Sequence, residues 1–183
     1  MSLTLSNMME LGTKAPDFIL TDTISGKKLS LVEAKSDIAT VVAFICNHCP
    51  YVIHVNPKLV EVANKYQAKG VQFIAISSND IATHPQDGPE FMKQVAEKLG
   101  YPFPYLYDES QEIAKAYMAE CTPDFFVFDN NLKCVYRGRF DESRPKKGIP
   151  TGKDLAAALD AIIAGTKVNL NQHPAMGCSI KWK

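Results

Sequence analysis

The sequence lacks long apolar runs and an excess of either charge. None of its apolar stretches approaches the roughly 20 residues that a membrane-spanning helix needs, and its 20 lysines and arginines balance its 20 aspartates and glutamates. No overall field therefore favours nucleic acid or a charged surface. Residues 1–10 have no basic start and no long apolar core, which makes them a poor export signal. From these absences we expect a cytoplasmic protein that binds neither membranes nor nucleic acid.

Cysteine is scarce as well, and its number is odd. Five cysteines in 183 residues are too few for a fold held together by disulfides. In a reducing compartment, a close pair of cysteines more often does redox chemistry or binds metal than staples a fold. Internal repeats, linkers and low-complexity segments are missing too, and this length suits one compact domain that buries roughly 70% of its unfolded surface. We therefore predict a single domain over residues 1–183, whose oligomeric state stays open.

One dithiol motif is present, Cys46-Asn47-His48-Cys49, directly after the apolar run 40–45. Two thiols three residues apart at the end of a buried strand can open and close a disulfide with little backbone movement. If a helix begins after Cys49, its unpaired N–H groups and its positive dipole end stabilise a thiolate there. Because the thiolate is the reactive form, the motif predicts a dithiol redox protein.

Strand and helix signals alternate along the chain. A hairpin is expected first, with its turn at Ser25-Gly26, and a helix after Cys49 is expected to kink or restart near residue 56, before Pro57. Thr151 and Asp154 resemble a capping box for a late helix, and the last eighteen residues show no clear periodicity. The expected strands cover residues 17–22, 27–30, 40–45, 71–77, 105–107, 124–128 and 133–137, and the expected helices cover 50–69, 89–99, 110–118 and 151–164. This order predicts an α/β domain, a mixed sheet with helices on both faces.

Three motifs in order carry a resemblance to a known superfamily. They are Ala-Pro-Asp-Phe at 15–18, Phe-Ile-Cys-Asn-His-Cys-Pro at 44–50, and Thr-Pro-Asp-Phe-Phe-Val-Phe-Asp at 122–129. With them the chain resembles the thioredoxin-like superfamily, in the redoxin branch of the alkyl hydroperoxide reductase/thiol-specific antioxidant proteins. The resemblance runs from about residue 12 to about 165 and leaves 166–183 as a tail. It implies a thioredoxin-like fold, a central mixed β-sheet flanked by helices, with an N-terminal β-hairpin extension.

The resemblance also implies roles for five residues. Cys46 would attack a substrate disulfide, and Cys49 would resolve the mixed disulfide that results. His48 lies where disulfide isomerases and strong oxidants hold a histidine, whose imidazole stabilises the thiolate. Thr122 and Pro123 would form a cis peptide bond that faces the dithiol. The expected function is a thiol–disulfide oxidoreductase that acts on protein or small-molecule disulfides or peroxides, is recycled by a thiol reductant, and needs no cofactor.

An alternative function arises from Pro50. Peroxiredoxins carry their peroxidatic cysteine directly before such a proline, which would make Cys49 the cysteine that reacts with peroxide. Those enzymes have threonine or serine three residues before it, where this chain has Cys46, so the peroxide-orienting hydroxyl is missing. A thiol-dependent peroxidase is therefore the second hypothesis.

Thioredoxins also bury an acid six residues before the first cysteine, where it assists proton transfer. This chain has Thr40 at that position, so a different group must move the proton.

The remaining candidates are accessory residues. Cys121 precedes Thr122-Pro123, and it either relays the disulfide or packs as a small hydrophobic residue. Arg137 is a candidate for lowering a cysteine pKa, although arginines on a strand surface usually do nothing of the kind. Cys178 is either a distant resolving thiol or part of a docked tail, the latter being the simpler expectation, and Cys134 is expected in the core.

A metal site is the third hypothesis. Cys46, Cys49 and His54 offer part of a zinc or copper ligand set. The sequence has no second C-x-x-C motif and no histidine pair at zinc-ligand spacing to complete it. We therefore expect no metal in this protein.

Overall fold

The computed structural model describes residues 3–183, so the first two residues of the predicted domain lie outside it. In chain order the strands are β1 (Leu3–Leu5), β2 (Ile19–Asp22), β3 (Lys28–Ser30), β4 (Ala39–Phe44), β5 (Gln72–Ser77), β6 (Tyr105–Tyr107), β7 (Cys121–Thr122), β8 (Asp124–Asp129), β9 (Cys134–Gly138) and β10 (Met176–Ser179). The helices are α1 (Leu31–Ala34), α2 (Pro50–Gln67), α3 (Pro89–Leu99), α4 (Glu112–Ala116) and α5 (Lys153–Ile163), and a short 3-10 helix, η1 (Pro85–Asp87), precedes α3. The predicted strands and helices are all present, with ends shifted by a few residues.

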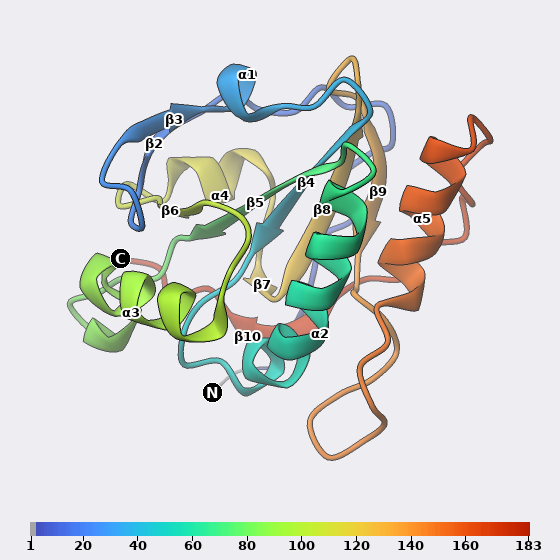
Figure 1. The fold of residues 1–183 in the computed structure, drawn as a ribbon. Coiled ribbons are helices and arrows are strands. Elements are labelled where there is room, and N and C mark those ends of the chain that lie inside the picture. The colour runs from blue at the N-terminus through green and yellow to red at the C-terminus, as the bar shows by residue number, and fades with distance from the viewer. Residues whose placement is uncertain (1–2) are drawn as a thin grey trace.

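A seven-stranded mixed sheet in the order β3-β2-β6-β5-β4-β8-β9 forms the centre (Figure 1). Strand β4 lies inside it, parallel to β5 and antiparallel to β8. Its side chains alternate between the two halves of the core, with Val41 and Ala43 in one half and Val42 and Phe44 in the other. Because both faces are covered, all six residues of β4 are buried, which explains its unbroken apolar sequence.

Helices cover both faces of the sheet. Buried residues of α2, α3 and α5 belong to one half of the core, and those of α1 and α4 belong to the other. The predicted N-terminal hairpin is confirmed as the antiparallel pair of β2 and β3 at one edge. In the described part of the chain, no helix combines the length and the apolar character that crossing a membrane requires.

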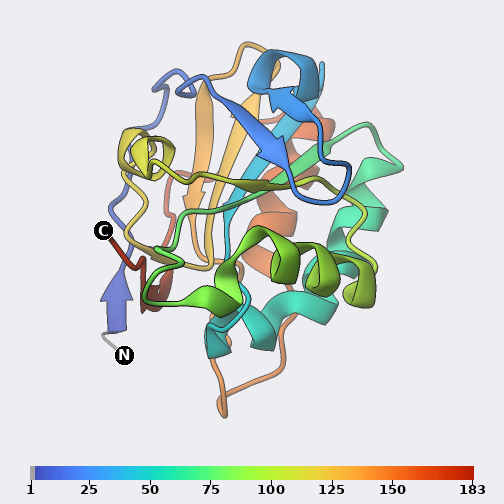
Figure 2. The same ribbon diagram turned by 90° about the vertical axis from the view of Figure 1, so that its left-hand side faces the viewer.

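Helix α2 begins directly after Cys49, with Pro50 in its first turn. Proline is favourable there because its missing N–H would have had no partner. The helix continues through Pro57 as one element to Gln67, so it bends rather than restarts. Its axis changes direction between its first and last turns (Figures 1 and 2).

The predicted capping box of α5 is wrong. Gly152 caps this helix with a left-handed backbone, φ +69°, and no side chain caps it. The Asp154 carboxylate accepts from Arg139 Nε at 2.6 Å instead of reaching back to the helix start. Asp154 thus binds Arg139 and does not take part in the capping box that the spacing predicted.

The chain ends build a second, three-stranded sheet that the sequence did not indicate, in the order β1-β10-β7. Strand β10 pairs antiparallel with β1 and β7, and Cys178 lies opposite Thr122. Its Gly177 passes so close to β7 that a Cβ there would lie 1.9 Å from the Thr122 carbonyl oxygen. Only glycine fits this contact. The C-terminal tail is therefore docked directly against the strand that precedes Pro123.

Candidate active site

The dithiol lies at the junction of β4 and α2. Cys46 follows β4 by two residues, and Cys49 is the residue before the first turn of α2. Both side chains are buried, Cys46 at 2% and Cys49 at 0% exposure, and each thiol shifts the pKa of the other. The predicted strand-to-helix placement of the motif is confirmed.

Thr122, the residue before Pro123, contacts both sulfurs. The peptide bond between Thr122 and Pro123 is cis, as expected. The Thr122 hydroxyl lies 3.4 Å from Cys46 Sγ, and the Thr122 carbonyl oxygen lies 3.2 Å from Cys49 Sγ. A proline at this point donates no hydrogen bond, so the backbone beside the dithiol offers acceptors.

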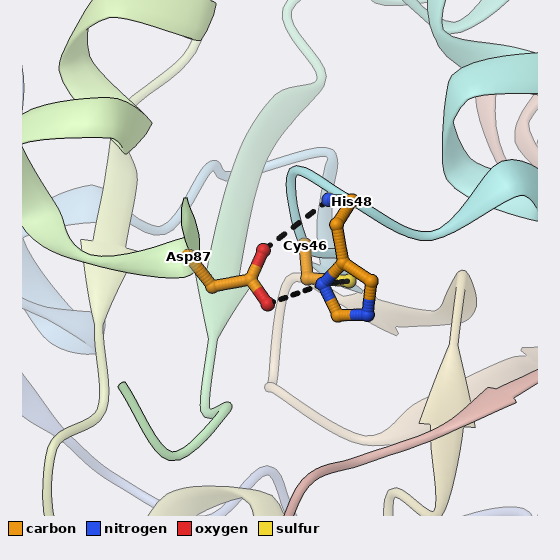
Figure 3. Close-up of side chains that lie close together, drawn as sticks. All are labelled: Cys46, His48 and Asp87. Carbon is orange, nitrogen blue, oxygen red and sulfur yellow. Dashed lines mark hydrogen bonds and ion pairs between the residues drawn. The ribbon is translucent and has the colours of Figure 1, made fainter. Parts of the chain in front are cut away.

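His48 points toward Cys46 and toward an acid from another segment (Figure 3). Its Nδ1 lies 4.0 Å from Cys46 Sγ and 2.5 Å from Oδ2 of Asp87, the last residue of η1. The His48 ring also stacks on the His84 ring, with centroids 4.9 Å apart. Because one carboxylate oxygen engages Nδ1, the ring orientation is fixed beside the sulfur.

Asp87 organises the whole loop. It is fully buried, and Oδ1 accepts the backbone N–H groups of Asn47 at 2.8 Å and His48 at 3.2 Å. Oδ2 accepts from His48 and from the Asn79 amide at 2.8 Å. A buried carboxylate needs such partners. In the sequence only its place in a polar loop distinguishes Asp87, so it was not among the predicted site residues.

In the reduced protein the negative charge of the dithiol lies on Cys49, because the pKa of Cys49 is lowered and that of Cys46 is raised. The Cys46 thiol donates to Cys49, and contacts with Cys178 and the backbone N–H of Val52 add to this, so the pKa of Cys49 falls to about 5 despite its burial. The pKa of Cys46 is raised, first because its thiol donates to Cys49, then by burial and by the Asp87 carboxylate. The two sulfurs share one proton and titrate as a pair.

This arrangement makes the titration of Cys49 testable. The thiolate absorbance of the reduced protein is expected to rise with a midpoint near pH 5, because Cys49 ionises first. Cys46→Ala should raise that midpoint most, by roughly one pH unit or more, and Cys178→Ala should raise it less, since each removes a donor. Absorbance at thiolate wavelengths against pH measures this, with Cys121→Ala as the control. An unchanged midpoint in Cys46→Ala would contradict the shared proton.

Cys178 joins the dithiol from the docked tail. Its Sγ lies 2.8 Å from Cys49 Sγ, although the two residues are 129 positions apart in sequence. Cys178 is buried at 3% exposure. Burial and the neighbouring Cys49 raise its pKa to about 12. The expected docked tail is thus present, and it brings a third sulfur to the site.

In the part of the chain that the structure describes, the other accessory candidates make no hydrogen bond to the dithiol, although Cys121 lies close enough that, besides burial, Cys49 and Cys178 affect its pKa. Burial raises the pKa of Cys121 far above its usual range, and Cys121 pairs with Ser179 across the small sheet. Cys134 lies in the core, as expected, where its thiol contacts the Tyr136 carbonyl oxygen. Arg137 donates to the Met9 carbonyl oxygen and to the Gln172 side chain, each at 2.7 Å, so its hydrogen bonds lead away from the dithiol.

A buried acid follows the cis proline. Asp124 begins β8 and pairs in register with Phe44, two residues before Cys46. Its side chain is fully buried, and this burial raises the pKa of the carboxyl well above its usual range. Thr40 occupies the position where thioredoxins bury an acid, and Asp124 supplies a buried acid on the neighbouring strand.

A hollow opens beside Pro123. Tyr51 and His54 of α2 line one side, and Asp141, in the segment after β9, and Met176 of β10 line others. Concave surfaces with both apolar and polar groups are typical of binding sites. This hollow therefore offers room for a segment of substrate next to the cis proline.

A cation has one set of candidate ligands in the described residues. Ligand atoms of Cys46, His48 and Asp87 all lie within 4.8 Å of one another. The metal set considered from sequence included His54, whose Nε2 instead lies 3.1 Å from the Ser143 hydroxyl. The three clustered groups already hydrogen-bond or contact one another, so the cluster is fully explained as part of the dithiol site.

Comparisons with known proteins agree with this geometry. Residues 11–137 match the model of the AhpC/TSA family. A thiol-disulfide oxidoreductase ResA from Bacillus thuringiensis subsp. konkukian (strain 97-27) is 30% identical over 143 residues, which cover 77% of this chain and 76% of that protein.

Solved structures show the same fold. An uncharacterized conserved protein from Geobacillus kaustophilus is 60% identical with a TM-score of 0.98, covering 100% of this chain and 97% of that one. A putative thioredoxin from Neisseria meningitidis, 23% identical, has a TM-score of 0.65 and covers 86% of this chain and 95% of its own. The predicted thioredoxin-like fold is thereby confirmed.

Proposed function

The chain belongs to the AhpC/TSA family and is a thiol–disulfide oxidoreductase, and from this premise we propose that Cys46 attacks the substrate and Cys49 resolves the intermediate. One observation carries this assignment. Cys46 lies beside the His48 ring, whereas Cys49 is enclosed by Thr122, Cys178 and the start of α2. We therefore expect an incoming disulfide to meet Cys46 first.

The first step uses the proton that Cys46 and Cys49 share. Cys46 passes its proton to Cys49, which holds the charge in the resting pair. The Cys46 thiolate then attacks one sulfur of the substrate disulfide, and that S–S bond breaks. One substrate thiolate leaves and takes up a proton, and the other half stays bound to Cys46 as a mixed disulfide.

The second step depends on how well Cys49 holds a negative charge. The Val52 backbone N–H and Cys178 still stabilise its thiolate when Cys46 is in the mixed disulfide. Cys49 loses its proton, attacks the Cys46 sulfur and releases the second substrate thiol. The substrate is reduced by two electrons, and the protein is left with a Cys46–Cys49 disulfide for a thiol reductant to reopen. Run backwards, the same steps oxidise a dithiol.

His48 and Asp87 position the attacking sulfur. Asp87 holds the Asn47 and His48 backbone in place and orients the His48 ring toward Cys46. The ring is thereby held with its Nδ1 4.0 Å from the sulfur that attacks.

The surroundings favour disulfides as substrates. The hollow beside Pro123 is open to an extended segment, and the backbone next to the cis bond presents acceptors. The ResA relative is described as a thiol-disulfide oxidoreductase. We propose protein disulfides as the substrate class, with the segment that carries the disulfide lying along the hollow.

A peroxidase is the second candidate, and one observation favours it. Cys49 lies directly before Pro50 and has the lowered pKa that a peroxidatic cysteine needs. Against it, Cys49 has no measurable exposure, and the position three residues earlier holds a thiol instead of a hydroxyl.

Turnover measurements separate the two functions. With dithiothreitol as reductant, the purified protein is expected to reduce insulin disulfides at least tenfold faster than dithiothreitol alone, and to consume hydrogen peroxide no faster than a free thiol does. The rates are followed by insulin precipitation and by peroxide concentration, with Cys134→Ala as the matched control. Rapid peroxide consumption that survives Cys46→Ser and is lost in Cys49→Ser would overturn the assignment.

A further inference from the structure

We propose that Cys178 is a second resolving thiol, which takes the disulfide over from Cys46 and stores it as a buried Cys49–Cys178 bond. The proposal rests on the proposed function, because the Cys46–Cys49 disulfide from which it starts is the product of that reaction. It gives the C-terminal strand a redox role that the family motifs do not contain, since Cys178 lies outside the matched residues 11–137.

The placement of the three sulfurs carries the proposal. Cys49 belongs to the C-x-x-C motif with Cys46, and its Sγ lies 2.8 Å from Cys178 Sγ. A disulfide bond is about 2.05 Å long, so the second pair needs to close by less than about 1 Å. Each of the two partners is therefore within reach of the same central sulfur.

The fold holds Cys178 at this point firmly. Strand β10 is fixed on both sides, to β1 and to β7, and Cys178 pairs in register with Thr122. The Thr122 carbonyl oxygen also touches Cys49 Sγ. Gly177 allows β10 to approach β7 where any side chain would collide. The strand that presents Cys178 is thus built against the same residue that faces the dithiol.

The chemical step is an exchange within the protein. The Cys178 thiolate attacks Cys49 Sγ, the Cys46–Cys49 bond breaks, and Cys46 leaves as a thiolate that takes up the proton lost by Cys178. One S–S bond forms and one breaks, so no outside oxidant is needed. In the reduced protein the neighbouring Cys49 helps to raise the pKa of Cys178. That contribution disappears when Cys49 becomes part of a disulfide, which favours ionisation of Cys178 at the moment it is needed.

The product differs from the ordinary oxidised enzyme. Cys46 is again a thiol beside the His48 ring, whereas Cys49 is bonded to Cys178 of the docked tail and is no longer available to act on Cys46. A substrate that then binds to Cys46 has no resolving thiol and stays attached, so the relay makes the enzyme hold its substrate under oxidising conditions.

Peptide mapping tests the relay. The reduced protein is treated with one equivalent of diamide, quenched in acid, blocked with N-ethylmaleimide under denaturing conditions and digested with trypsin. Cys46 and Cys49 share the peptide 36–58, whereas Cys178 lies in 168–181 and Cys121 in 116–133. We expect two oxidised forms, an internal disulfide in 36–58 and a cross-link of 36–58 to 168–181 with Cys46 blocked by maleimide.

Three variants show which cysteines form each disulfide. Cys178→Ser should lose the cross-link to background and keep the internal disulfide, Cys46→Ser should convert almost completely to the cross-link, and Cys121→Ser should behave as the wild type. An internal disulfide in the wild type together with no cross-link in Cys46→Ser would overturn the relay and leave the proposed function standing. Failure of Cys178→Ser to form the internal disulfide would overturn the proposed function, and the relay with it.

Discussion

Cys46→Ser is expected to reduce disulfide turnover at least about a thousandfold, because a serine hydroxyl cannot form the bond to sulfur on which both steps depend. Cys49→Ser should lose turnover to the same degree but fail at a later stage. Its Cys46 still attacks, so about one equivalent of substrate becomes attached before the reaction stops. The measurement is insulin reduction together with the thiol released per protein in the first turnover.

The two variants are informative only if their folds are intact. Cys134→Ala serves as the matched control, because Cys134 is equally buried but lies in the core of β9, in contact with Tyr136. It should keep turnover within about twofold of the wild type. Equal, stoichiometric attachment of substrate to both Cys46→Ser and Cys49→Ser would show that the two sulfurs do not have separate roles.

Asp124→Asn is expected to change how stability depends on pH. The carboxyl is fully buried and its pKa is raised in the folded protein, whereas in the unfolded chain it ionises near pH 4. As the pH rises above 4, the unfolded state loses this proton and the folded state keeps it, so the wild type is destabilised progressively. Asparagine has no such proton. Relative to the wild type, the variant should gain as much as about 2.5 kcal/mol between pH 4.5 and 6.5.

Urea unfolding of both proteins at the two pH values measures this gain. The comparison is between differences, so a constant cost of placing an amide in the buried site cancels. Asp37→Asn, at a fully exposed aspartate, controls for the change in net charge and should show no gain. Parallel pH dependence of wild type and Asp124→Asn would mean that the buried acid is ionised in the folded protein.

Local sequence patterns predicted most of the strands and helices of this fold. The unbroken apolar run of β4, the proline after Cys49 and the turn residues of the hairpins indicated the central sheet and the start of α2. The order of the three motifs indicated the thioredoxin-like fold and the cis bond at Thr122-Pro123. These features follow from local propensity and from motifs that carry their own geometry.

Contacts between distant segments could not be predicted in the same way. Asp87 reaches the dithiol loop from 39 or 40 residues away, and its short 3-10 helix has no periodic pattern. Strand β10 is four residues long, and its place beside β7 depends on pairing with Thr122 and on the close approach of Gly177. The capping box failed for a related reason, because Arg139 competes for Asp154. In each case the decisive partner lies elsewhere in the chain.

The location of the first covalent bond tests the central claim most directly. Cys49→Ser is combined with Cys178→Ser, so that no neighbouring thiol can take over resolution, and is mixed with a disulfide-containing peptide. Mass spectrometry of the tryptic digest then identifies the sulfur in peptide 36–58 that carries the adduct. The account predicts a stoichiometric mixed disulfide on Cys46. A stable adduct on Cys49 in Cys46→Ser, with none on Cys46 in the double variant, would contradict it.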